Sequence, residues 1–463
     1  MGERRNGVGK RKADVRLTRR GRVLAWSAGV LCVGVLGVAG AGTWIYQQLN
    51  GNITSADVDD KLGGDRPENL SPGSKNIMIV GSDSREGANS GYGNSKDLTT
   101  MQSDTLLVLH IPADRKWASV LSFPRDSWVR IPVCDKGDGT KSKEHHFKIN
   151  EAFALGGTSG EVAGAAACSI KTVEENTGLR IDHFMSIDFS GFKGMVDALD
   201  GIEVCPKTAI DSPKAKLKLP AGCQTIDGET SLGYVRARYG VGDNSDIGRI
   251  GRQQEFMDAL AKKAKSKLTS PDAMYGFLNS ATKSLTADKE MAGIKPLYAL
   301  ASELKGIPSD RLAFLTVPNY PREADVPTDK ANVVWQYPQA ADLFTSLAKD
   351  QETTKDALTA KTKNLVYTSS VKVRVLNGTG VPGRAAAVAQ KLKENGFTVV
   401  STGNAPSNVG KSAVQYAQGA DDTGARALAT RLGGKVTATA SGKASAGVVN
   451  LVVGPDLRVD DMY

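Results

Sequence analysis

A long uncharged segment near the start of the chain limits where the rest of it can fold. Residues 23–46 contain no Asp, Glu, Lys or Arg, and only a serine and a threonine interrupt their apolar character. As a helix, roughly 24 residues would be about 36 Å long, enough to cross the hydrocarbon core of a bilayer. Trp26, Trp44 and Tyr46 lie near its two ends, where membrane interfaces favour aromatic rings. We therefore expect a single transmembrane helix over residues 23–46.

The residues before this segment are strongly basic. Nine Lys or Arg lie within residues 1–22 against two acidic residues, so this tail carries about +7 of the net charge of +9. A positive flank stays cytoplasmic, which predicts a single-pass cell-membrane protein whose larger part is extracellular. A cleaved signal peptide with its small-residue site at 39–41 is the alternative, but its apolar core is usually about 7–15 residues long. Because little positive charge remains elsewhere, we expect no nucleic-acid partner.

Cysteine usage fits an oxidising compartment. Cys32 lies inside the apolar segment, and the four cysteines that follow are an even number, which suggests two disulfides. Cys205 and Cys223 flank a short excursion of the chain, so we favour that pair, which leaves Cys134 with Cys168. Three connectivities are possible in principle. A zinc site is the rival interpretation, but the sequence has no Cys-x-x-Cys spacing to support it.

The chain beyond the apolar segment divides by composition. Residues 47–74 are polar and rich in Gly, Pro and Asp, which predicts a tether. Strand and helix patterns mix over residues 75–349, which predicts an α/β (α+β) domain with a mixed central sheet flanked by helices. The polar residues 350–368 predict a linker or a charged helix. A small α/β domain follows over residues 369–456, where a repeated strand–helix–strand order suggests a ferredoxin-like sandwich.

One motif in the small domain imitates a nucleotide site. Gly378-Thr-Gly-Val-Pro-Gly383 follows a predicted strand and opens a predicted helix, as dinucleotide binding requires. However, no Asp or Glu ends the next strand, and the unit is too small for a doubly wound sheet. We interpret the motif as a tight turn with Pro382 near the first helical position, where proline is favoured.

Charged residues cluster at the ends of four apolar runs in the larger domain. The runs are Asn76–Arg85, Gln102–Leu109, Val120–Asp126 and Leu232–Arg238. The first three predict β-strands that begin or end in a charged turn. The fourth predicts a strand with two arginines on one face. Further along, helical spacing places three side chains on one face of a predicted helix: Arg249, Arg252 and Gln253.

These side chains suit a metal-bound phosphate ligand. Carboxylates hold a hard cation through oxygen, so Asp83 and Asp104 are candidate cation ligands. Arginine forks grip phosphate oxygens bidentately and do not lose their charge. The candidate phosphate clamps are Arg85, Arg125, Arg236 and Arg238. A single Arg or Asp is more often part of a surface ion pair. What favours a site is that several such signals lie within one domain.

Several motifs together resemble those of the LytR-CpsA-Psr family over about residues 76–322. They are Gly-Ser-Asp-Ser-Arg, Ser-Asp-Thr, Phe-Pro-Arg-Asp, Lys-Ile-Asn-Glu-Ala-Phe, Tyr-Val-Arg-Ala-Arg and Gly-Arg-Gln-Gln. The small domain resembles the LytR C-terminal domain, with Val-Leu-Asn-Gly-Thr-Gly at residues 375–380. The basic tail, the single anchor and the extracellular cysteines are similar to those of actinobacterial members.

The resemblance implies a phosphotransferase that moves a glycopolymer from a polyprenyl-pyrophosphate carrier to peptidoglycan, at the primary hydroxyl of N-acetylmuramic acid. It implies that Asp83 and Asp104 hold Mg²⁺, and Asp83 is also our candidate for the general base. The implied pyrophosphate contacts come from Arg125, Arg236 and Arg238, with support from Arg85, Arg249 and Gln253. Gln102 departs from the family pattern, in which Arg is frequent. One contact is therefore lost unless Arg249 or Arg252 supplies it.

Two other functions stay open at this point. A hydrolase of polyprenyl pyrophosphate would use the same site with water as the acceptor. A non-catalytic cell-wall-binding scaffold would depend on the C-terminal domain alone. A transcriptional regulator is disfavoured because no helix-turn-helix pattern precedes the anchor. The lipid tail would need an apolar groove, which Phe184–Phe192 and Met195–Leu199 could line, although such runs are more often ordinary core.

Overall fold

The computed structural model describes residues 42–82, 103–237, 246–267, 270–363, 365–432 and 436–459, with backbone alone for 246–250. The chain divides into two compact units, Met1–Gly51 and Asn52–Tyr463. In the first unit, residues 42–51 are helical, and residues 23–41 of the predicted anchor lie outside the described part. Within that part, no helix combines the length and the apolar character that a bilayer span requires.

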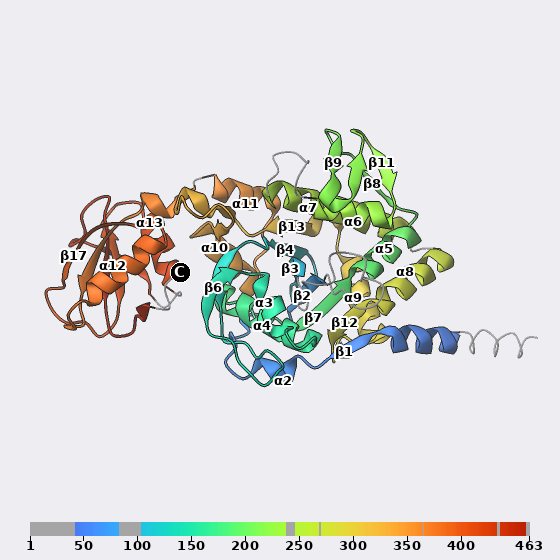
Figure 1. The fold of residues 1–463 in the computed structure, drawn as a ribbon, viewed down its shortest axis with the longest axis horizontal. Coiled ribbons are helices and arrows are strands. Elements are labelled where there is room, and N and C mark those ends of the chain that lie inside the picture. The colour runs from blue at the N-terminus through green and yellow to red at the C-terminus, as the bar shows by residue number, and fades with distance from the viewer. Residues whose placement is uncertain are drawn as a thin grey trace, which may run out of the picture. The chain divides into compact units, whose positions relative to one another are not determined.

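A seven-stranded sheet forms the centre of the larger domain (Figure 1). Its order is β1-β12-β7-β2-β3-β4-β13. The strands are β1 (Thr54–Ala56), β2 (Lys75–Ser82), β3 (Ser103–Ile111), β4 (Ala118–Phe123), β7 (His183–Asp188), β12 (Leu285–Asp288) and β13 (Leu312–Thr316). Strand β2 pairs antiparallel with β3 and parallel with β7, so the predicted mixed sheet is confirmed.

Helices pack on both faces of this sheet because side chains of a strand alternate between them. Met78 and Val80 of β2 join one core, whereas Ile77 and Ile79 pack in another. The first core includes α2 (Asp59–Leu62), α3 (Glu151–Gly156), α4 (Val162–Thr177) and α10 (Gln339–Ala348). The second includes α9 (Ile294–Gly306). A third core joins α5 (Phe189–Ala198), α6 (Gly228–Arg236), α7 (Asp246–Lys267) and α8 (Pro271–Lys283).

Short antiparallel pairs extend the domain, and two disulfides fix two of its excursions. The pairs are β5 (Trp128–Ile131) with β6 (His145–Lys148), β8 (Ile202–Val204) with β11 (Gln224–Ile226), β9 (Ile210–Ser212) with β10 (Leu217–Leu219), and β14 (Asn319–Pro321) with β15 (Val333–Trp335). The disulfides join Cys134 to Cys168 and Cys205 to Cys223, which confirms both predicted pairs. The second closes the excursion that contains the β9–β10 hairpin.

The predicted strand over Leu232–Arg238 is wrong, because its first part is the end of helix α6. Asp227 caps this helix, and its side chain accepts a hydrogen bond of 2.8 Å from the backbone N–H of Thr230. Such a cap satisfies an amide at the helix start that would otherwise lack a partner. Arg236 is therefore the last residue of a helix, and Arg238 lies outside the described residues.

The C-terminal domain has a five-stranded sheet in the order β17-β16-β20-β18-β19. Its elements are β16 (Lys372–Asn377), α12 (Arg384–Glu394), β17 (Thr398–Asn404), β18 (Ala413–Ala417), α13 (Thr423–Arg431), β19 (Ala438–Ser441) and β20 (Val449–Val453). The ferredoxin-like prediction is wrong: α12 joins β16 to its parallel neighbour β17, whereas that motif keeps another strand between the two. The sequence reasoning also missed β19.

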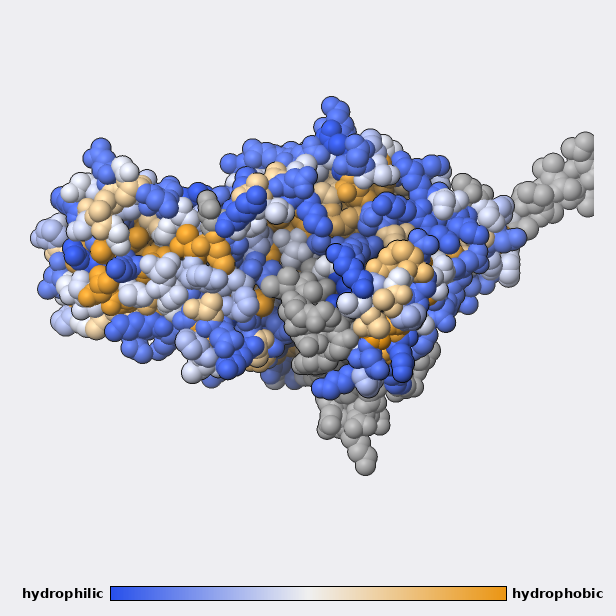
Figure 2. Space-filling model, turned by 90° about the horizontal axis from the view of Figure 1, so that it is seen from above, coloured by the Kyte–Doolittle hydropathy of each residue, from blue (hydrophilic) through white to orange (hydrophobic). Residues whose placement is uncertain are grey.

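The segment between the domains is not a simple linker. Residues 350–368 contain α11 (Lys355–Thr362), and Leu358 of this helix belongs to the core around α4. The charged-helix alternative was therefore the better one. Figure 2 shows a mainly polar face of the molecule on which apolar residues form small patches. Most large apolar side chains of both domains lie inside their cores.

Candidate functional site

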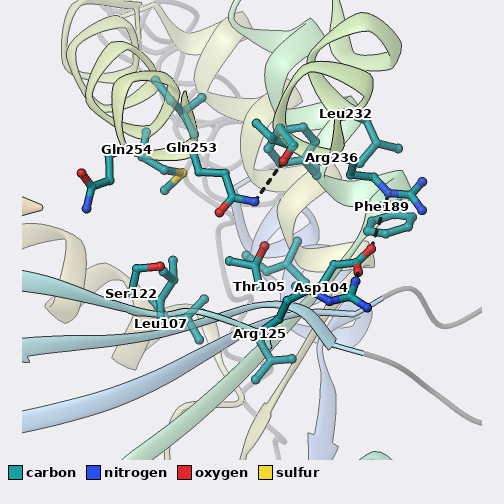
Figure 3. A pocket seen from close by; sticks show the side chains of 18 of the residues that line it. Asp104, Thr105, Leu107, Ser122, Arg125, Phe189, Leu232, Arg236, Gln253 and Gln254 are labelled. Atoms are coloured by element: carbon teal, nitrogen blue, oxygen red, sulfur yellow. Dashed lines mark hydrogen bonds and ion pairs between the residues drawn. The ribbon is translucent and has the colours of Figure 1, made fainter. Parts of the chain in front are cut away.

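A cavity of about 490 Å³ lies between the central sheet and the helices of the third core (Figure 3). Strands form one wall and helices α5, α6 and α7 form the other. Apolar side chains make up most of the lining: Ile79, Val80, Leu107, Val120, Ile187, Phe189, Phe192, Met195, Ala215, Leu232, Val235, Met257, Leu260, Phe314 and Leu315. A lining of this kind is suited to a hydrocarbon chain.

Three charged side chains meet in this cavity. Arg125 Nη1 donates a hydrogen bond to one carboxylate oxygen of Asp104, and Arg236 Nε lies 3.5 Å from the other oxygen. The strand register explains the first contact. Leu106 pairs with Phe123 across β3 and β4, so the residues two positions beyond, Asp104 and Arg125, face each other at the strand ends. The structure thus brings together three of the site residues predicted from the sequence.

An aromatic ring supports Arg236. The guanidinium lies 4.5 Å from the centre of the Phe189 ring. Figure 3 shows the ring beside Arg236. Phe189 is the first residue of α5, and Asp188 caps this helix by accepting a hydrogen bond of 2.8 Å from Gly191 N–H. Arg236 also ends α6, where the helix dipole favours a cation. The sequence reasoning missed this role of Phe189, because only the fold brings the ring under the arginine.

The disulfide-closed excursion contributes to the same cavity. Ser212, Lys214 and Ala215 lie among its lining residues. From the sequence, this excursion was expected only to carry a disulfide. The apolar runs predicted as groove or core turn out to be both. Phe189, Phe192 and Met195 line the cavity, whereas Phe184, Val196 and Leu199 are buried in the cores.

The helix that carries Arg252 and Gln253 is confirmed as α7, but the two side chains differ. Gln253 lines the cavity, and its Nε2 donates a hydrogen bond of 2.9 Å to the Val235 carbonyl oxygen. Arg252 donates to the Ala237 carbonyl oxygen and is not among the lining residues. Both therefore hold the end of α6, where Arg236 lies.

The other predicted site residues are not described. Asp83 and Arg85 lie outside the described residues, and so does the side chain of Arg249. Within the described part, no group of three or more His, Cys, Asp or Glu is placed to hold a metal ion. Asp104 supplies one carboxylate at the cavity, and Asp83 follows Ser82, whose strand partner Ser103 precedes Asp104. A hard cation takes several oxygen ligands, so Asp104 fits such a site as one ligand of a larger set.

Two family models match the chain. Residues 45–351 match the LytR_cpsA_psr family, and residues 370–457 match the LytR cell envelope-related transcriptional attenuator domain. The chain belongs to the LytR-CpsA-Psr family. The resemblance noted from the motifs is thereby confirmed for both domains.

Similar proteins include two from Corynebacterium glutamicum. Probable cell wall biosynthesis protein LcpB is 33% identical over 348 residues, which cover 73% of this chain and 74% of LcpB. Cell wall biosynthesis protein LcpA is 28% identical over 427 residues, which cover 86% of this chain and 80% of LcpA. The polyisoprenyl-teichoic acid–peptidoglycan teichoic acid transferase TagT of Bacillus subtilis is 28% identical over 296 residues, which cover 62% of this chain and 83% of TagT.

Proposed function

We propose that this chain is a membrane-anchored, Mg²⁺-dependent phosphotransferase that moves a glycopolymer from a polyprenyl-pyrophosphate carrier to peptidoglycan. The observation that carries the proposal is that one cavity holds two arginines beside Asp104 and is otherwise lined mainly by apolar side chains. A polyprenyl pyrophosphate has the same division into an anionic head and a hydrocarbon tail. The activity named for TagT, together with the names of LcpA and LcpB, supports this assignment.

In this reaction, Arg125 and Arg236 bind the pyrophosphate oxygens and stabilise the negative charge that builds up on the departing phosphate. The acceptor hydroxyl oxygen bonds to the phosphorus that carries the polymer. The bond from that phosphorus to the bridging oxygen breaks, and polyprenyl phosphate leaves. The hydroxyl proton passes to a base, for which Asp83 is the candidate. Asp104, together with Asp83, would hold Mg²⁺, which supplies positive charge against the pyrophosphate.

The surroundings of the site support a location outside the cell membrane. Two disulfides are formed in the domain that carries the cavity, which fits an oxidising compartment. The basic tail and the uncharged residues 23–46 fit a single anchor with a cytoplasmic N-terminus. A lipid-linked donor in the outer leaflet would then be on the same side of the membrane as the larger domain.

The proposal is tested with the full-length chain in detergent, a lipid-linked oligosaccharide donor and peptidoglycan fragments. We expect Mg²⁺-dependent linkage to the fragments and release of polyprenyl phosphate. Release without linkage would replace the transferase with a hydrolase. If neither linkage nor release occurs, the non-catalytic cell-wall-binding scaffold would be the remaining function.

A variant tests the role of the apolar wall. Leu107→Glu places a charge in this wall, whereas Val400→Glu changes an exposed residue of the C-terminal domain. Because burying a carboxylate against hydrocarbon is costly, Leu107→Glu should slow transfer from a long-chain donor at least about tenfold and slow a short-chain donor much less. Val400→Glu should change neither. Equal losses with both donors would contradict a lipid-binding wall.

A further inference from the structure

An arginine of the C-terminal domain is buried against the larger domain. Arg431 ends α13 and is only 6% exposed. Its guanidinium carbon lies 5.4 Å from the centre of the Tyr337 ring, and its Nη2 donates hydrogen bonds of 3.4 Å to the Tyr320 hydroxyl oxygen and to the Trp335 carbonyl oxygen. Ala427, one turn earlier on α13, belongs to the first core of the larger domain. A cation is tolerated inside a protein only with such partners, so this contact fixes α13 to strands β14 and β15.

A second buried arginine lies on the larger domain and contacts the C-terminal domain across the same interface. Arg322 of the larger domain is 9% exposed, and its guanidinium lies 4.6 Å from the centre of the Trp128 ring. Its Nη2 donates to the carbonyl oxygen of Glu394, at the end of α12. Gly396 follows at a close approach, since a Cβ there would lie 2.6 Å from the Cβ of Asp325. The two domains therefore meet through matched, closely packed surfaces.

Strand β15, whose residue Trp335 accepts a hydrogen bond from Arg431, also forms hydrogen bonds with the residues that follow Arg125. The N–H of Val333 on β15 donates to the Asp126 carbonyl oxygen at 3.0 Å. The indole Nε1 of Trp335 donates to the Ser127 hydroxyl at 2.9 Å. Trp335 is thus hydrogen-bonded to the C-terminal domain through its carbonyl group. Through its side chain, it is bonded to a residue two positions after Arg125.

Lys148 also binds Asp126, the residue after Arg125. Lys148 Nζ donates to Asp126 Oδ1 at 2.8 Å and to the Ala331 carbonyl oxygen at 3.0 Å. The same Asp126 oxygen lies 3.7 Å from Arg125 Nε. The backbone and the side chain of Asp126 are therefore both fixed next to the arginine that enters the cavity.

We propose that the C-terminal domain positions Arg125 for catalysis, through Arg431, Trp335 and Ser127 as positioning residues. Without the Arg431 contact, the strand β15 loses a partner, and the residues after Arg125 gain freedom. Transfer of a phosphoryl group depends on donors that are already oriented when the charge develops, so a small displacement of this guanidinium slows the reaction. The effect on turnover rests on the proposed function, whereas the effect on the Arg125 segment does not.

The test uses the full-length chain with Arg431→Ala and the milder Arg431→Gln. The matched control is Arg426→Ala. Arg426 lies five residues earlier on the same helix and pairs across the same interface with Asp342, but both side chains are 41% exposed. Hydrogen–deuterium exchange of the peptide over residues 124–131 reports on the segment. The kcat and KM of transfer report on the reaction, and circular dichroism shows which variants are folded.

We expect both Arg431 variants to speed exchange in residues 126–128 and to lower kcat about tenfold with a less than twofold change in KM, while Arg426→Ala changes neither. Unchanged exchange in the folded Arg431 variants would overturn the proposal. An equal change in Arg426→Ala would overturn it too. The effect would then come from weaker contact between the two domains as a whole and not from Arg431. If the wild type shows no transfer but the exchange responds as expected, the proposed function fails and the positioning role stands.

Discussion

Asp104 is the counter-charge of two arginines, and removing its charge should weaken the folded protein. Its carboxylate accepts a hydrogen bond from Arg125 and lies 3.5 Å from Arg236 Nε. Asp104→Asn keeps the shape of the side chain and removes its negative charge. The two guanidinium groups would then face each other across the cavity without an anion between them.

The magnitude follows from the partial exposure of these groups. Asp104 is 18% exposed, Arg125 21% and Arg236 31%. At an effective dielectric constant of about 20, the contact with Arg236 corresponds to roughly 5 kcal/mol of gross attraction, most of which desolvation offsets. Breaking an exposed pair costs up to about 1 kcal/mol, and breaking a buried pair costs about 3–5 kcal/mol. We therefore expect the free energy of unfolding to fall by about 2 kcal/mol.

The assay is denaturant and thermal unfolding, with and without inorganic pyrophosphate. Asp104→Asn should melt several degrees lower than the wild type. Pyrophosphate without Mg²⁺ should stabilise the variant more than the wild type, because no carboxylate competes for the arginines. Asp211→Asn, whose pair with Lys218 spans 3.9 Å between exposed side chains, serves as the control and should change little. An unchanged unfolding midpoint for Asp104→Asn, or equal stabilisation of variant and wild type by pyrophosphate, would refute the reasoning.

Three further predictions concern the surroundings of the site and the fold. Phe189→Leu removes the ring beneath a guanidinium, and kcat/KM of transfer should fall about fivefold, whereas Phe189→Tyr should retain it. Replacing Cys205 and Cys223 by serine should lower the free energy of unfolding by about 3 kcal/mol and raise the KM for the lipid donor, since their hairpin lines the cavity. The interaction with Asp288 raises the pKa of His183, so its stabilisation is complete below about pH 6.5 and fades as the pH rises through the folded pKa. His183→Gln should thus lower stability more in urea unfolding at about pH 5.5 than at about pH 8.5, and an equal loss at both would contradict this.

The sequence predicted the parts of the site that depend on local pattern. Strands β2, β3 and β4 alternate apolar residues or bury both faces, so their charged ends could be located before the fold was known. The register that sets Asp104 opposite Arg125 was not visible, because it depends on pairing between distant segments. The disulfides were predictable because four cysteines allow few pairings and one pair flanks a short excursion.

Local pattern also misled in two places. Tyr-Val-Arg-Ala-Arg alternates like a strand, and the signal that decides otherwise is the helix cap at Asp227, five residues before Leu232. In the C-terminal domain, the order of elements along the chain was largely right, but the order of strands in the sheet was not. Strand order depends on which apolar faces of strands and helices pack against each other. That packing involves segments far apart in the chain, so no single segment of the sequence determines it.

The Cys205–Cys223 disulfide, which closes the β9–β10 hairpin, affects when the cavity is completed. Part of the cavity wall, including Ser212 and Lys214, lies inside a loop that is closed covalently only when Cys205 and Cys223 are oxidised. A newly made chain with both thiols reduced has this wall held by non-covalent packing alone. The finished cavity therefore forms only under oxidising conditions. Under the proposed function, competence to handle a lipid-linked donor would be coupled to arrival in an oxidising compartment.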